Sequence, residues 1–142
     1  MVPRRVRKGT TCVGATAILL LAAVFIAPPV LARIVANTID PVAVVADDGR
    51  HLVLTGPITC IANERAYLRV TVAQRETGAV AEGRTLITCS GGSQQWEVHA
   101  STLGKKAFHA GPATAVALGR TTTRGDVTDA NQWLVEISLI EG

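Results

Sequence analysis

Apolar and more polar residues alternate one by one along most of the chain from Val42 onward. In residues 66–75, for example, Leu68, Val70 and Val72 are each separated by a more polar residue. Such a period of two places alternate side chains on opposite faces of a strand, so that one face packs in a core and the other meets water. No segment of about 11 residues shows the apolar spacing of an amphipathic helix. The sequence therefore predicts an all-β domain.

Turn-forming Gly, Pro, Asp and Ser residues divide this region into about seven expected strands. Their expected ranges are 42–46, 52–60, 66–75, 84–89, 95–102, 113–120 and 132–140. The Asp48-Gly49 pair between the first two is a strong hairpin signal. Gly56-Pro57 within the second indicates an edge strand or a bulge. The alternation also places Trp96 and Trp133 on inward faces.

Seven strands with one cysteine pair and a nearby tryptophan favour an immunoglobulin-like antiparallel β-sandwich over residues 41–142. Residues 33–40 are expected to form a short linker before it. Trp96 follows the second cysteine, whereas antibody-type domains place the tryptophan between the two cysteines. A partly closed β-barrel therefore remains an alternative.

Cys60 and Cys89 are the only cysteines beyond the N-terminal region, and both fall on inward positions of their expected strands. Neither has a second cysteine or a histidine at metal-ligand spacing. In an exported chain they are expected to form a disulfide, and the alternative is two free thiols. Closing a loop of about 30 residues stabilises a fold by roughly 3–4 kcal/mol in the chain-entropy model.

The first 32 residues have the organisation of a secretory signal peptide. Four basic residues between positions 4 and 8 precede an apolar stretch, residues 12–27, that holds no charged side chain. Cleavage is expected after Ala32, with Ala36 as the second choice, and an uncleaved membrane anchor is the alternative. The protein is thus expected to be secreted or to lie on the extracellular face of the cell envelope.

The charge of the chain changes when the expected signal is removed. That segment carries four of the 14 Lys and Arg residues and none of the 11 Asp and Glu residues. The 110 residues that remain of 142 have ten basic and 11 acidic side chains, so their net charge is −1. The basic pI of about 9.1 belongs to the signal, and nucleic-acid binding is not expected. Contact with a membrane is expected only through an uncleaved N-terminal segment.

Four segments carry a resemblance to other proteins. They are Leu54–Cys60, Leu68–Gln74, Thr88–Gly91 with Gln95-Trp96, and Phe108–Ala113. This pattern of turns, cysteines and a Gln-Trp element resembles small exported proteins of high-GC actinobacteria, which are mostly uncharacterised. The resemblance covers nearly the whole expected mature chain. It implies an envelope or extracellular location and supplies no reaction.

No catalytic residue, cofactor or metal ligand is expected. The Ser90–Ser93 run, for instance, lacks the Gly-x-Ser-x-Gly frame of many serine hydrolases. A binding or structural role is predicted instead, with an envelope or extracellular protein or glycan as partner, and contacts are expected in loops 90–95, 105–112 and 120–131. The candidate binding residues are Ser90, Gln94, Gln95, Arg124, Asp126 and Asp129.

Two alternatives to a simple binding role remain open. His51 and His99 face outward on their expected strands and could meet across a sheet. A small exported hydrolase or a metal-dependent enzyme could use His51, His99 or His109 with a nearby carboxylate. Separately, Asp126, Asp129 and Asn131 offer oxygen ligands that calcium could use, although their spacing does not match the twelve-residue calcium loop.

Overall fold

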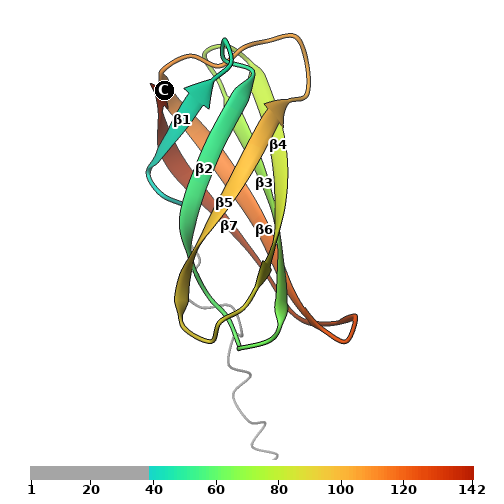
Figure 1. Ribbon diagram of the computed structural model, residues 1–142. Coiled ribbons are helices and arrows are strands. Elements are labelled where there is room, and N and C mark those ends of the chain that lie inside the picture. Colours follow the sequence, from blue (N-terminus) through green and yellow to red (C-terminus); the bar gives the residue numbers. More distant parts are fainter. Residues whose placement is uncertain (1–38) are drawn as a thin grey trace, which may run out of the picture. The chain divides into compact units, whose positions relative to one another are not determined.

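The computed structural model describes residues 39–142, which fold into a closed barrel of seven β-strands (Figure 1). The strands are β1 (Val42–Ala46), β2 (His51–Thr59), β3 (Arg65–Gln74), β4 (Ala79–Thr88), β5 (Ser93–Thr102), β6 (Gly111–Thr123) and β7 (Asp126–Glu141). Around the barrel they follow the order β1-β2-β5-β4-β3-β6-β7. Neighbouring strands are antiparallel except β1 and β7, which run parallel. None of the described residues forms a helix that could cross a membrane.

The predicted all-β class and the number of strands are confirmed. The first strand has the expected bounds, and the hairpin expected at Asp48-Gly49 joins β1 to β2. Two differences concern strand ends. Residues 79–83, which were expected to lie in a turn, are the first half of β4. The expected loop 120–131 consists mostly of the paired ends of β6 and β7 around a tight turn.

The predicted immunoglobulin-like sandwich is corrected to a closed barrel, close to the alternative that the position of Trp96 left open. Closure depends on the parallel pairing of the first and last strands, from Val42 with Ser138 to Val45 with Glu141. The sequence did not reveal this pairing, because alternation determines which face of a strand is buried and not which strand lies beside it. Most of the expected linker, residues 33–40, lies outside the described residues. Both expected cleavage sites lie wholly outside them.

One end of the barrel is joined less extensively than the other. Strands β4 and β5 pair only from Ala81–Thr102 to Gly83–Ala100, and β1 reaches β2 only as far as Val53. Beyond Val53, strand β2 therefore pairs with β5 alone, so Pro57 lies on the edge position that its missing N–H requires. The β2–β5 register continues through Pro57 without a bulge.

The predicted disulfide joins Cys60 and Cys89 at this end, with their Cα atoms 5.5 Å apart. Cys60 directly follows β2 and Cys89 directly follows β4, and β5 lies between those two strands in the barrel. The backbone N–H of Cys89 also donates to the carbonyl of Glu64, directly before β3. The bridge therefore holds together the part of the barrel where backbone pairing between β4 and β5 has ended.

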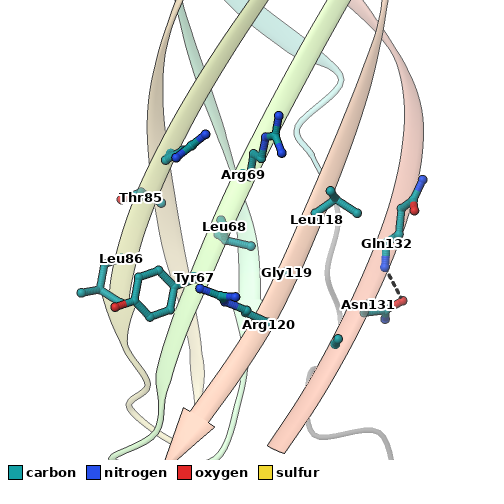
Figure 2. A pocket seen from close by; sticks show the side chains of 12 residues that line it. Tyr67, Leu68, Arg69, Thr85, Leu86, Leu118, Gly119, Arg120, Asn131 and Gln132 are labelled. Atoms are coloured by element: carbon teal, nitrogen blue, oxygen red, sulfur yellow. Dashed lines mark hydrogen bonds between the residues drawn. The ribbon is translucent and has the colours of Figure 1, made fainter. Parts of the chain in front are cut away.

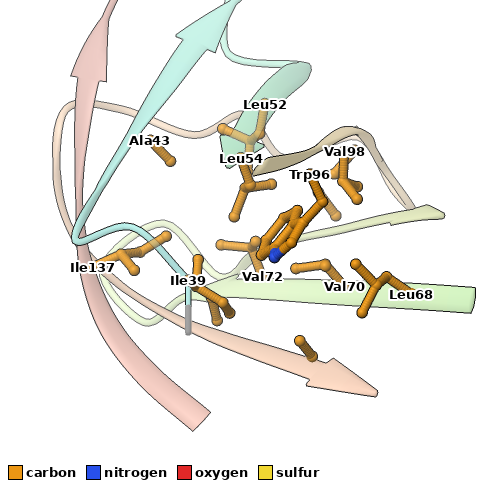
Figure 3. Packing of buried hydrophobic residues seen from close by; sticks show 14 of the residues in the cluster. Ile39, Ala43, Leu52, Leu54, Leu68, Val70, Val72, Trp96, Val98 and Ile137 are labelled. Atoms are coloured by element: carbon orange, nitrogen blue, oxygen red, sulfur yellow. The ribbon is translucent and has the colours of Figure 1, made fainter. Parts of the chain in front are cut away.

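The core fills the barrel with the inward side chains that alternation predicted. Trp96 is 2% exposed and lies among Leu54, Val70 and Val98 (Figure 3). The inward side chains of β6 are small, among them the buried alanines at 113, 115 and 117, which leaves room for such larger neighbours. Trp133 was expected to be fully inside, but it is only partly buried and packs against the edge of this core.

Candidate functional site

The outer faces of β4, β3, β6 and β7 line an open groove of about 1110 Å³, which we call the basic groove (Figure 2). Its lining consists of Tyr67, Leu68, Arg69, Arg84, Thr85, Leu86, Leu118, Gly119, Arg120, Ala130, Asn131 and Gln132. Three of these side chains are guanidinium groups, and none is a carboxylate. The groove therefore combines positive charge with apolar surface.

Strand register explains why these side chains share one face. Tyr67 on β3 stands opposite Leu86 on β4 and Arg120 on β6. The next outward residue of β3, Arg69, stands opposite Arg84 and Leu118 in the same way. Directly opposed residues of a sheet point to the same side and touch. Two adjacent rows of the sheet thus build most of the groove.

Tyr67 is the aromatic centre of the first row. The guanidinium carbon of Arg120 lies 5.1 Å from the centre of its ring, a cation–π contact, and Leu86 lies beside the ring on the other side (Figure 2). Tyr67 remains 39% exposed, Leu86 45% and Leu118 44%. These three side chains leave apolar surface in water next to the arginines.

Arg69 and Arg84, in the second row, share one carboxylate at the edge of the groove. Arg69 Nη2 lies 2.5 Å from one oxygen of Glu82, and Arg84 Nη2 lies 2.9 Å from the other. The hydrogen bond from Arg69, followed by that from Arg84, lowers the pKa of the Glu82 carboxyl. Both arginine side chains stay at least half exposed. Glu82 therefore balances one positive charge and leaves both guanidinium groups accessible.

The groove contrasts with the charge of the whole barrel. Residues 39–142 contain nine Lys and Arg against 11 Asp and Glu, a net charge of −2. The groove and Glu82 together carry three positive charges and one negative charge. Positive charge is thus concentrated on one face of a slightly acidic domain, which favours an anionic partner at that face.

Three candidate binding residues, Ser90, Gln94 and Gln95, lie together at the β4–β5 turn. The side chain of Gln94 already forms hydrogen bonds within that turn. Gln94 Oε1 accepts a hydrogen bond of 2.7 Å from the backbone N–H of Ser90, and its Nε2 donates to the carbonyl of Thr88. Gln95 is exposed on β5 opposite Pro57. The side chain of Gln94 therefore shapes this turn, and Ser90 and Gln95 are the exposed residues beside it.

The other candidates belong to the β6–β7 hairpin. Arg124 and Gly125 form its tip with φ angles of 53° and 89°, and Asp126 pairs with Thr123 directly behind it. Asp129 lies within β7, where its Oδ1 accepts from the backbone N–H of Ala130. Within residues 39–142 no group of three or more His, Cys, Asp or Glu side chains is arranged to hold a metal ion. Asp126 and Asp129 are therefore not joined by a third such ligand.

His51 and His99 do meet across the sheet, on the outer face of β2 and β5. His51 Nε2 lies 3.0 Å from His99 Nδ1, and His99 Nε2 lies 2.8 Å from a carboxylate oxygen of Glu97. Ser101 Oγ lies 3.5 Å from His51 Nδ1. His109 is elsewhere, in the loop after β5. We call His51, His99, Glu97 and Ser101 the histidine network. It lies on the outer face of β2 and β5, and none of its residues lines the basic groove.

The groove was not identified from the sequence, although its signal was present. Arg69 and Tyr67 were correctly placed on the outward face of their strand. Leu86 and Leu118 also face outward, and large apolar side chains on an outer face can indicate a binding surface. What could not be derived was that β4, β3, β6 and β7 lie side by side. That adjacency brings arginines 36 residues apart, Arg84 and Arg120, to one surface.

Comparison with known proteins adds no functional information. No protein-family model matches the sequence, and no curated protein is significantly similar to it.

Proposed function

We propose that this protein is an exported binding module whose basic groove recognises an acidic, partly apolar polypeptide segment of an envelope or extracellular protein. The observation that carries this proposal is the interleaving of three exposed arginines with Tyr67, Leu86 and Leu118 in one groove. The proposed contact surface is therefore the outer face of the sheet, and not the loops in which contacts were expected from the sequence.

The chemistry of the groove suits a peptide with carboxylates and apolar side chains. The planar guanidinium groups of Arg69, Arg84 and Arg120 match carboxylates in shape and charge. Leu86 and Leu118 gain from contact with apolar side chains, because such contact removes their exposed surface from water. In an extended peptide, every second side chain lies on the same face, about 7 Å from the next. Outward residues of β3 such as Tyr67 and Arg69 have the same separation.

Two other anionic partners fit less well. A sugar ring would stack on an aromatic face, but Arg120 already covers one face of Tyr67 and Leu86 lies beside the ring (Figure 2). A bilayer would meet apolar side chains that protrude, whereas these line a hollow. A peptide can enter the groove and present both kinds of side chain.

Export is supported by two independent features. The N-terminal 32 residues have the pattern of a secretory signal, and a structural disulfide such as Cys60–Cys89 is typical of proteins in oxidising compartments. Both expected cleavage positions precede residue 39, where the described residues begin. Cleavage after Ala32 or Ala36 would therefore leave every described residue in place.

The proposal is tested with the probe peptide Glu-Ser-Leu-Ser-Glu-Ser-Leu-Ser, which places Glu and Leu on one face when extended. Binding to the purified protein is measured by calorimetry. Arg69→Gln and Arg120→Gln should each weaken binding about tenfold, the effect of losing one charged hydrogen bond. Arg75→Gln is the matched control, because Arg75 is exposed and lies outside the groove. It should have no effect.

Two control peptides separate the contributions to binding. Replacing both Glu residues by Lys should abolish binding through charge, and replacing both Leu residues by Ser should weaken it through lost apolar contact. Equal binding of the lysine peptide, or an equal loss in Arg75→Gln, would contradict the proposal.

The histidine network favours a second candidate, a small exported hydrolase or metal-dependent enzyme. Two imidazoles and a carboxylate are in hydrogen-bond contact, which acid–base chemistry requires. Ser101, however, is at the limit of hydrogen-bond distance, and the network lies outside the groove that could hold a substrate. Hydrolysis of an activated ester that disappears in both Ser101→Ala and His51→Gln would support this candidate.

A further inference from the structure

We propose that His51 and His99 form a two-ligand site for a borderline divalent transition-metal ion, Cu²⁺ or Zn²⁺, on the outer face of β2 and β5. This site is independent of the basic groove, which lies on β4, β3, β6 and β7.

The β2–β5 ladder places the two imidazoles side by side. His51 pairs with Ser101 and His99 pairs with Val53, so the histidines are diagonal neighbours on one face. Their facing nitrogens, His51 Nε2 and His99 Nδ1, are 3.0 Å apart. Two nitrogen ligands at about 2.0–2.1 Å from one ion, at an angle near 90–110°, are themselves roughly 3–3.4 Å apart. The pair already has the spacing of two ligands of a single ion.

The hydrogen bonds define which nitrogen of His99 has a free lone pair. A carboxylate can only accept, so His99 Nε2–H donates to Glu97, and in a neutral imidazole His99 Nδ1 then carries the lone pair. His51 Nε2–H then donates to that nitrogen. His51 Nδ1 is left to accept from the hydroxyl of Ser101. This assignment satisfies every contact in the network with neutral imidazoles.

A metal ion can replace the shared hydrogen without a net change in protonation. When the proton of His51 moves from Nε2 to Nδ1, Nδ1–H donates to Ser101 Oγ instead of accepting from it. Both His51 Nε2 and His99 Nδ1 then present lone pairs to the ion. The rings are tilted by 37° to each other and the side chain of His99 is 57% exposed, so rotation toward a common point meets little resistance.

Glu97 is a positioning residue for this site. It holds the ring of His99 from the side opposite the metal position, as carboxylates do in many histidine metal sites. Imidazole ligands select copper, zinc and similar ions over Mg²⁺ and Ca²⁺, which prefer oxygen. With two protein ligands, the other coordination positions remain available to water or to a donor from a partner.

The site is tested by calorimetric titration of the purified protein with CuCl₂ and with ZnCl₂. His51→Gln and His99→Gln should each lower the affinity at least as much as the roughly tenfold loss expected for Glu97→Gln, which removes only the supporting carboxylate. His109→Gln is the matched control, since it removes the third histidine of the described residues, and it should bind as the parent does. The melting temperatures without metal should be similar, because none of the substituted side chains is buried.

Location is measured separately, by the broadening of backbone amide NMR signals with substoichiometric Cu²⁺. The signals of His51 and His99 and of their neighbours on β2 and β5 should broaden first. Broadening centred on the N-terminal amine or on His109, or undiminished binding in the His51→Gln/His99→Gln double variant, would overturn the proposal. MgCl₂ binding that competes with Cu²⁺ would overturn the assignment of metal class.

Discussion

Arg69 and Arg84 stand directly opposite each other in the β3–β4 ladder, and each donates to a different oxygen of Glu82. Like charges in this position repel and destabilise a sheet. One carboxylate therefore makes it possible for two guanidinium groups to face outward side by side. The same arrangement ties the stability of the β3–β4 pair to the charge of the basic groove.

Replacing Glu82 by Gln should change stability and binding in opposite directions. The melting temperature should fall because Arg69 and Arg84 then repel each other without compensation. Affinity for the acidic probe peptide should rise several-fold because the groove gains a full positive charge. Glu76→Gln, which removes an exposed carboxylate outside the groove, is the control and should change neither strongly. A parallel loss of stability and binding would contradict this account of Glu82.

The pH dependence of the same contact has a definite sign. The arginines lower the pKa of Glu82 in the folded state, so the contact stabilises the fold above the ordinary carboxyl pKa of 4.5. This contribution should be lost as the pH falls from there through the lowered folded pKa. Melting curves recorded between neutral and acidic pH should therefore show the difference between the parent and Glu82→Gln shrinking below about pH 4.5. A difference independent of pH would mean that the ion pairs are not its source.

The disulfide should be a stabilising bridge without a chemical role. Because its removal frees a loop closed over 29 residues, replacing Cys60 and Cys89 together by Ala should cost roughly 2–5 kcal/mol of unfolding free energy. Urea unfolding measures this cost. Peptide binding at subdenaturing conditions should be retained, since neither cysteine lines the groove. Alkylation of both thiols in the native, unreduced protein would contradict the bridge.

Gly83→Ala should be strongly destabilising because a Cβ there would collide with the backbone carbonyl of His99 and with Val98. Gly83 also belongs to one of the three residue pairs that join β4 to β5. A steric clash in a packed position costs roughly 1–3 kcal/mol or more. Gly104→Ala is the matched control, because open space surrounds that position. If the two variants were equally stable by thermal melting, the pairing of β4 with β5 would tolerate a side chain at position 83.

The two tryptophans should contribute unequally. Trp96→Ala should cost about 3–5 kcal/mol, the range for emptying an aromatic site in a core. Trp133→Ala should cost less, because Trp133 is partly exposed at the edge of the core. Urea unfolding of both variants measures the difference. A larger loss for Trp133 would place the centre of the core nearer β7 than the structure does.

Local patterns in the sequence predicted local structure well. The alternation of Leu52, Leu54 and Ile58 identified their buried face, and Asp48-Gly49 identified the first hairpin. Both are properties of a few consecutive residues. The inward parity of Cys60 and Cys89 likewise agreed with their disulfide. The buried face and the hairpin are determined by residues close in sequence, and the disulfide depends on a single pair of residues.

Properties that depend on distant strands were not predicted. The parallel pairing of Val42 with Ser138 joins residues 96 positions apart, and no local signal marks it. The start of β4 at Ala79 was missed because small residues there give weak strand periodicity. The basic groove could be identified only with the neighbours of β3 known. Arg69 was therefore interpreted only as part of the outward face of its own strand, and the alternation along residues 113–120 did not show which way Leu118 faces. The histidine contact was raised as an option because both imidazoles were assigned to outward faces, and its distance came from the β2–β5 register.

The central claim, that the basic groove is the binding surface, is tested most directly by the NMR footprint of the probe peptide on the isotope-labelled protein. The account predicts that the backbone amide signals of Tyr67, Arg69, Leu118 and Arg120 shift progressively with added peptide, and that the shifts vanish with the lysine-containing control peptide. Shifts confined to the β4–β5 turn, residues 90–95, or to the loop 105–112 would contradict it and would return the binding surface to the loops.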